Sequence, residues 1–124
     1  AIVDGNEGKK YDGVFDFRFS PDSQKLAYGA GVDSRGLIVI EGVEGKKYDW
    51  VDSIVFSPDS QHIAYKARIG GPNEGNNYFV VVDNVEGRKY DEIVSESLIF
   101  DSPDKLRYMA IRKGVWYLVE ENTE

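Results

Sequence analysis

Three Tyr-Asp pairs are the residues in this sequence whose types and spacing come closest to acid–base chemistry. A phenol beside a carboxylate can exchange a proton with a substrate when both groups reach it. Each pair, however, ends the same short motif, Glu-Gly-basic-Lys-Tyr-Asp, and a catalytic constellation is needed only once in a chain. We therefore interpret the three pairs as architectural. They are Tyr11–Asp12, Tyr48–Asp49 and Tyr90–Asp91.

The sequence contains no convincing set of residues for nucleophilic catalysis. His62 is the only histidine, and it takes the place of Lys25 before a predicted strand, which favours a solvated structural role. No Ser-His-Asp set and no Gly-x-Ser-x-Gly elbow can be assembled around it. The glycine-rich segment 70–75 lacks both a Lys-Ser/Thr ending and a following helix, and this argues against phosphate binding.

The composition limits the partners that we expect. The 124 residues include 15 basic and 22 acidic side chains, a net charge of −7, so binding to nucleic acid is not expected. No apolar run approaches membrane-spanning length, and membrane binding is not expected either. There is no cysteine to form a disulfide or a thiolate site. We expect no cofactor. Calcium is retained as an alternative because carboxylates crowd several loops, although none has EF-hand spacing.

The elements that must position these residues form a tandem repeat. A Phe-Ser-Pro-Asp turn motif and the Tyr-Asp motif recur together about every 40 residues, which is close to the length of a propeller blade. No segment has the 3.6-residue periodicity of a helix, so helical repeats are excluded. The turn motif occupies Phe19–Gln24, Phe56–Gln61 and, in weaker form, Phe100–Asp104. The Tyr-Asp motif begins at Glu7, Glu44 and Glu86.

Each unit predicts four short antiparallel strands, A to D. Strand A ends in the Pro-Asp turn, whose aspartate we expect to bond its own turn amides. Strand C is an unbroken apolar run of the kind that is buried on both faces. Strand D is the Lys-Tyr-Asp segment at the outer edge. The predicted A strands are Phe15–Phe19, Ser53–Phe56 and Ser97–Phe100, strands B contain Tyr28, Tyr65 and Tyr108, and strands C are Leu37–Ile40, Phe79–Val82 and Trp116–Val119. Asp101, an extra residue before the third turn, predicts a bulge.

The Phe-Ser-Pro-Asp turn, the apolar-Ala-Tyr step and the Val-Val-Asp-like strand together resemble the WD-repeat-like Pro-Asp propeller repeat of the TolB type. The resemblance covers essentially the whole chain. It implies an all-β fold of propeller blades, six or seven to a ring, that serves as a protein-binding or gating scaffold. It also implies a soluble periplasmic or secreted protein, with the cytoplasm left open.

Three blades are too few to close a propeller, which typically needs four to eight. We expect residues 1–124 to form one domain with units 13–49, 50–91 and 92–124, the last completed by residues 1–12. Two copies would then close a six-bladed ring as a homodimer. Against this, residues 1–5 and 118–121 look like the same part of strand C. The alternative is that the chain is a fragment of a larger propeller.

The B-to-C and D-to-A connections vary between units, and variable loops on a rigid scaffold commonly carry binding. On this basis we predict a non-enzymatic module that binds a protein or peptide through one loop face. The alternative is a hydrolase or lyase that uses Asp52 and Glu92 in the axial channel. The candidate binding residues are Arg35, Trp50, Asp52, Arg68, Asn73, Glu74, Asn76 and Glu92.

Overall fold

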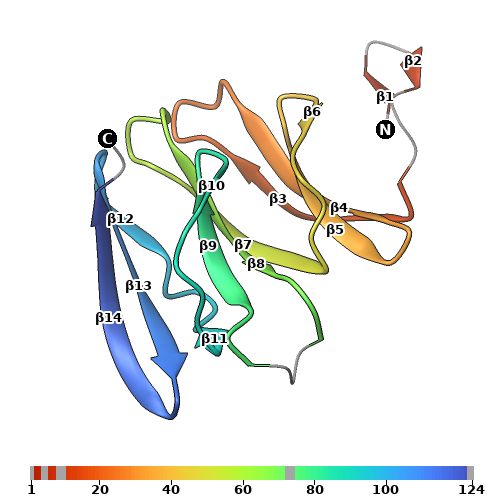
Figure 1. Cartoon of the computed structure of the whole chain (residues 1–124). Coiled ribbons are helices and arrows are strands. Elements are labelled where there is room, and N and C mark those ends of the chain that lie inside the picture. Colours follow the sequence, from red (N-terminus) through yellow and green to blue (C-terminus); the bar gives the residue numbers. More distant parts are fainter. Residues whose placement is uncertain (1, 4–5, 8–10, 72–74, 123–124) are drawn as a thin grey trace.

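The computed structural model describes residues 2–3, 6–7, 11–71 and 75–122. This part of the chain is all-β, with three antiparallel four-stranded sheets, a separate two-stranded hairpin and no helix. The three sheets follow one another in chain order (Figure 1). The predicted all-β fold with three four-stranded antiparallel units is confirmed.

The first two sheets repeat one topology, in which every strand pairs with the next along the chain. In each of these sheets the register between strands A and B shifts, between Phe15 and Arg18 in the first and between Asp52 and Val55 in the second. Both A strands begin earlier than predicted because their ladder with strand B continues before this shift. The first sheet contains β3 (Gly13–Phe19), β4 (Leu26–Val32), β5 (Arg35–Ile40) and β6 (Val43–Glu44). The second contains β7 (Trp50–Phe56), β8 (Ile63–Arg68), β9 (Tyr78–Val82) and β10 (Val85–Glu86).

The third sheet departs from this pattern. Its strand A is split into β11 (Glu92–Ile93) and β12 (Ile99–Ser102), which both pair with β13 (Lys105–Arg112). The prediction of one strand at 97–100 is therefore wrong. The chain leaves the ladder between the two pieces, where Ser97 bonds back to Val94. The register also shifts between Phe100 and Ser102, so the predicted bulge at Asp101 is confirmed.

The last strand, β14 (Val115–Asn122), pairs with β13 along its whole length. Its side chains are largely exposed, including those of Trp116 and Leu118, so the prediction that it is buried on both faces is wrong. In β9 a neighbouring sheet covers each face. Within the described residues no sheet lies beyond the third, and β14 remains open on that side.

The outer strand D was predicted at the Lys-Tyr-Asp segment but lies before it, so its predicted position is wrong. Only Val43–Glu44 and Val85–Glu86 form ladders, whereas the Lys-Tyr-Asp segment returns to strand C through one bridge, made by Tyr48 or Tyr90. The interruption falls at Gly87 in the second sheet, where an added Cβ would lie 3.0 Å from the carbonyl oxygen of Val80. The backbone therefore approaches strand C so closely there that a larger residue would force the Val80 backbone to shift.

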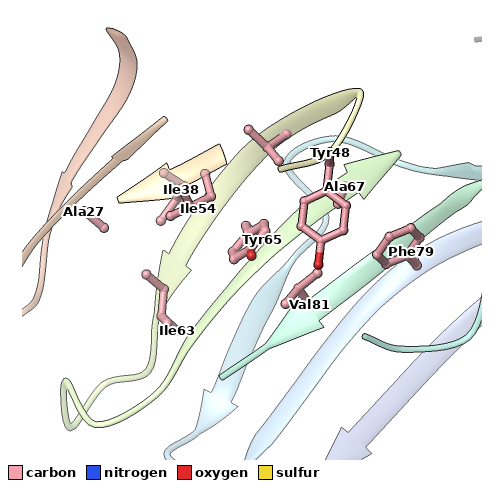
Figure 2. Packing of buried hydrophobic residues seen from close by; sticks show 10 residues of the cluster. Ala27, Ile38, Tyr48, Ile54, Ile63, Tyr65, Ala67, Phe79 and Val81 are labelled. Atoms are coloured by element: carbon pink, nitrogen blue, oxygen red, sulfur yellow. The ribbon is translucent and has the colours of Figure 1, made fainter. Parts of the chain in front are cut away.

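The core lies between sheets rather than inside one. Between the first and second sheets, Ile38 from β5 meets Ile54 from β7 and Tyr65 from β8, and Tyr48 closes the outer end (Figure 2). A second cluster between the second and third sheets repeats this arrangement around Tyr108. Burial of apolar side chains against a neighbouring sheet is therefore what stabilises each unit.

We name the two faces of each sheet from this stacking. The front face of a sheet is the one that packs on the preceding sheet, and its back face packs on the following sheet. Tyr65 marks the front of the second sheet and Val80 its back. By the same register, Tyr28 and Val39 mark the front of the first sheet, and Met109 and Leu118 mark the back of the third.

The N-terminal hairpin repeats part of the same unit. In β1 (Ile2–Val3) and β2 (Asn6–Glu7), Ile2 is paired with Glu7. Val39 is paired with Glu44 in the same way across β5 and β6. The hairpin therefore corresponds to the end of strand C and the start of strand D, and it lies apart from the three sheets (Figure 1).

Candidate binding site between the first two sheets

Repeated aspartates hold together the end of the molecule that was predicted to vary. Asp12 accepts a hydrogen bond from the backbone N–H of Asp33 at 2.9 Å, and Asp49 accepts one from Gly70 at 2.6 Å. Asp91 accepts bonds from Asn76 and Lys113. The Lys113 N–H first, and that of Asn76 second, hold the pKa of Asp91 below its usual range. These carboxylates fix the B-to-C connections, as expected for architectural residues.

The opposite end of the molecule is regular. Asp22 accepts bonds from the Ser20 hydroxyl and the Gln24 N–H, and these bonds lower its pKa in that order. Asp59 has the same two kinds of partner in the second sheet. His62 lies at this end and contacts Asp83, with 2.6 Å between its Nδ1 and a carboxylate oxygen. The predicted role of the Pro-Asp turn is thus confirmed for these two aspartates.

The structure places most of the candidate residues in strands, whereas they were predicted to lie in loops. Five of them were assigned to loops but belong to strands, because the hairpins are tighter than the sequence suggested. The first connection is only two residues, Asp33 and Ser34, both with positive φ, and such turns suit the twist of paired strands. The strand residues are Arg35, Trp50, Asp52, Arg68 and Glu92. Asn76 lies in the loop before β9, and Asn73 and Glu74 fall outside the described residues.

Trp50 forms an exposed aromatic platform. Its ring stacks on that of Phe15 from the first sheet, with centroids 6.3 Å apart and planes 16° apart. Its indole N–H donates to a carboxylate oxygen of Asp52 at 2.7 Å, which fixes the rotation of the ring. The side chain remains 46% exposed despite both contacts. A large apolar surface that is held in place but not covered is typical of a binding residue.

A cavity of about 320 Å³ lies beside this platform, between the first and second sheets. Arg35 borders it and forms an ion pair with Asp49, 3.6 Å between Nε and Oδ1. Both side chains are substantially exposed, and such a pair contributes little stability, so it can exchange partners at low cost. The cavity is lined by Asp12, Phe15, Gly31, Ser34, Arg35, Gly36, Asp49, Trp50 and Val51.

Arg68 supports the neighbouring loop. Its Nε donates to the carbonyl oxygen of Gly70 at 2.8 Å, and its guanidinium lies 6.0 Å from the ring centroid of Tyr78. In the register of the sheet it is paired with Trp50. The structure therefore brings Arg35, Trp50 and Asp52 together, with Arg68 beside them. Asn76 lies in the B-to-C connection of the second sheet, where its N–H bonds Asp91, and Glu92 lies on β11 of the third sheet.

Sequence reasoning missed a buried lysine on the back of the second sheet. Lys66 is 5% exposed, and its ammonium lies 3.0 Å from a carboxylate oxygen of Glu92 and 3.1 Å from the Ser95 hydroxyl. It also lies 4.9 Å from the ring centroid of Tyr78. The available signal was that Lys66 stands where the first sheet has Gly29 and the third has Met109. Glu92 is thereby committed to an ion pair.

The inner edges of the sheets carry the carboxylates of the alternative enzymatic prediction. A hollow of about 370 Å³ there is lined by Asp52 but not by Glu92. Each inner strand is interrupted at a residue with positive φ, namely Asp16, Ser53 or Glu96. Asp16 accepts a hydrogen bond from the Ile54 N–H at 3.2 Å and so ties the first sheet to the second. Of these two carboxylates, only Asp52 borders this hollow.

Tyrosine–glutamate bonds tie neighbouring sheets together at the outer rim. The Tyr48 hydroxyl donates to Glu86 at 2.9 Å, and Lys46 forms an ion pair with the same carboxylate. The Lys46 bond first, and the Tyr48 bond second, lower the pKa of Glu86. Tyr11 donates to Glu44 in the same way, and burial together with this bond raises its pKa to about 12. These contacts give Tyr11 and Tyr48 a structural role at the rim.

Among the described residues, no group of three or more His, Cys, Asp or Glu side chains is arranged to hold a metal ion. The same part of the chain contains no helix of the length and apolarity needed to cross a membrane. No protein-family model matches the sequence. A search of curated proteins also gives no match.

Proposed function

We propose that this chain is a non-enzymatic binding and assembly scaffold of the TolB-like propeller type. Two copies associate to close a six-bladed ring, and the cavity between the first and second sheets receives a segment of a protein or peptide partner. The observation that carries the binding proposal is the platform of Trp50 on Phe15, which is fixed by Asp52 and open to solvent.

The chemistry of the cavity defines the ligand. Trp50 and Phe15 offer an apolar wall for one large side chain. Arg35, whose pairing with Asp49 is exposed, offers a guanidinium to a neighbouring acidic side chain or a terminal carboxylate. We therefore propose a short extended peptide that carries an aromatic or aliphatic residue next to a carboxylate.

Selection of random displayed peptides on the immobilised protein tests this proposal. Peptides that bind the cavity should share an apolar residue next to an acidic one. Trp50→Ala and Arg35→Ala should each weaken their binding at least about tenfold. Val85→Ala is the matched control. Val85 is also an exposed apolar residue, but it lies on β10, away from the cavity. Peptides whose affinity is unchanged by both cavity variants would overturn the binding proposal.

A further inference from the structure

The inner part of the front face of the first sheet, on β3, is exposed where the same part of the other sheets is buried. Val14 and Val51 hold the same register position, because each is paired with an alanine of strand B. Val14 is 41% exposed, whereas Val51 is 0% exposed. Phe17 is likewise exposed, although Ile54 at the same position is buried. Comparison between the repeats shows that, within the described residues, no sheet covers this inner part of the face. Farther out on the same face, Leu37 and Val39 are buried in a small cluster with Tyr11 and Tyr28.

The back face of the third sheet is uncovered in the same way. Leu118 is paired with Met109 just as Val80 is paired with Lys66. Leu118 is 57% exposed, whereas Val80 is 0% exposed. Trp116 lies where the second sheet has Tyr78 and is 61% exposed. Each end of the stack therefore presents large apolar side chains at positions that are buried inside it.

A backbone bridge that is present inside the stack is also missing at its two ends. Tyr48 exchanges two hydrogen bonds with Gly36, both at 2.7 Å, and Tyr90 bridges Tyr78 in the second sheet. Tyr11 is the corresponding residue of the first Tyr-Asp motif, and Trp116 corresponds to Gly36 and Tyr78 in strand C. Within the described residues, neither Tyr11 nor Trp116 forms this bridge.

We infer that a second copy of this chain covers both faces, with the back of the third sheet of one copy packed head to tail on the front of the first sheet of the other. Leu118 and Trp116 of one copy then meet Val14 and Phe17 of the other, and Trp116 forms the missing backbone bridge with Tyr11. This inference rests on the association part of the proposed function and adds the surfaces and the register.

The occupant is a second copy because one chain carries both halves of the contact. The internal interfaces show that the back of one sheet fits the front of the next. The two open faces are the one back face and the one front face that remain without such a partner within the described residues. A contact between unlike faces of identical chains closes into a ring when the rotation fits, and two stacks of three sheets make six. A different protein covering one face would leave the other exposed.

The N-terminal hairpin of one copy and the end of β14 of the other correspond to the same part of strand C and cannot both occupy it. Ile2 corresponds to Val39 of the first sheet, and Val119 does as well, since both Val39 and Val119 pair with the strand B tyrosine. The inferred contacts of Trp116 and Leu118 precede this shared position. Removal of residues 1–7 should therefore leave association intact or strengthen it.

The test uses one charged substitution on each face of the full chain, followed by sedimentation equilibrium at micromolar concentration. Phe17→Asp disables the front face and Leu118→Asp the back face. Each variant alone should weaken dimerisation at least about thirtyfold, because both contacts of the ring are lost. An equimolar mixture should regain part of the dimerisation, because the intact back of one variant meets the intact front of the other while the second contact of the ring stays disabled. Val85→Asp on β10 should dimerise like the unaltered chain.

The outcomes separate this inference from the proposal on which it rests. If the unaltered chain dimerises but one variant remains dimeric alone, or the mixture does not recover, the contact joins like faces and the head-to-tail inference is overturned. If the unaltered chain is a monomer throughout, the association part of the proposed function fails with it. Circular dichroism confirms that the variants fold, and Val14→Asp replaces Phe17→Asp if that variant does not.

Discussion

Phe17 and Ile54 hold the same position in successive sheets, yet Phe17 is 57% exposed and Ile54 is 1% exposed. Each lies in the interruption of its strand, directly before pairing with strand B resumes at Arg18 or Val55. Both residues are apolar, so the difference comes from the neighbouring sheet that covers Ile54. The same position therefore contributes to the core in the second sheet and to the exposed surface in the first.

Alanine substitution of these two residues should have unequal effects on the monomer. Ile54→Ala removes packed methylene groups from the core, and we expect it to lower the free energy of unfolding by roughly 2–5 kcal/mol. Phe17→Ala should cost less than about 1 kcal/mol, because the ring is mostly in solvent. Urea unfolding at a protein concentration low enough to keep the chains monomeric measures both. Equal losses would show that Phe17 is buried in solution.

Gly29 should not tolerate alanine. A Cβ there would lie 2.4 Å from the Phe15 ring, which itself supports Trp50. Gly29→Ala should therefore destabilise the chain by roughly 1–3 kcal/mol through overpacking. It should also disturb the stacking that positions Trp50. Gly13→Ala is the control, since an added Cβ meets nothing within 4 Å, and we expect a change within about 0.5 kcal/mol. Thermal unfolding of both variants checks this contrast.

The ion pair between buried Lys66 and partly exposed Glu92 should respond asymmetrically to substitution. Glu92→Gln leaves a buried ammonium without its counter-charge and should cost roughly 1–3 kcal/mol. Lys66→Met installs the residue that the third sheet carries at this position, Met109, and should change stability by less than about 1 kcal/mol. In the double variant the loss caused by Glu92→Gln should largely disappear. A Lys66→Met variant less stable than Glu92→Gln would contradict this account.

Alkaline pH should destabilise the fold through its tyrosines. Burial raises the pKa of Tyr65 to about 12, and burial together with the Glu86 bond raises that of Tyr48 above its ordinary value. An unfolded tyrosine titrates near pH 10, so this contribution to stability is fully present below about pH 10. It is lost as the pH rises through the higher folded values.

The matched variant for the pH prediction is Tyr48→Phe. At neutral pH it loses the bond to Glu86 and should be less stable by roughly 1 kcal/mol. Above pH 10 its stability should fall less steeply than that of the unaltered chain. Urea unfolding at pH 8 and pH 11 compares the two slopes, and identical slopes would show that Tyr48 is not part of the alkaline transition.

Much of the fold was accessible from local sequence. The repeat, the strand B tyrosines, the Pro-Asp turns and the Asp101 bulge were predicted because each depends on residues that are close in the chain. Strand boundaries were less accessible, since they depend on how far a ladder continues. Trp50, Asp52 and Arg35 were assigned to loops for this reason, although their proximity at one end of the molecule was anticipated.

The sequence by itself determined which residues alternate across each strand, because side chains on a strand point to opposite faces with a period of two. It could not determine which of those faces a second sheet covers. Lys66 and Trp116 show this best: the tertiary structure buries the lysine against Glu92 and leaves the tryptophan in solvent, against the preference of both side chains. Burial is a property of neighbours distant in the chain, so only their packing decides it.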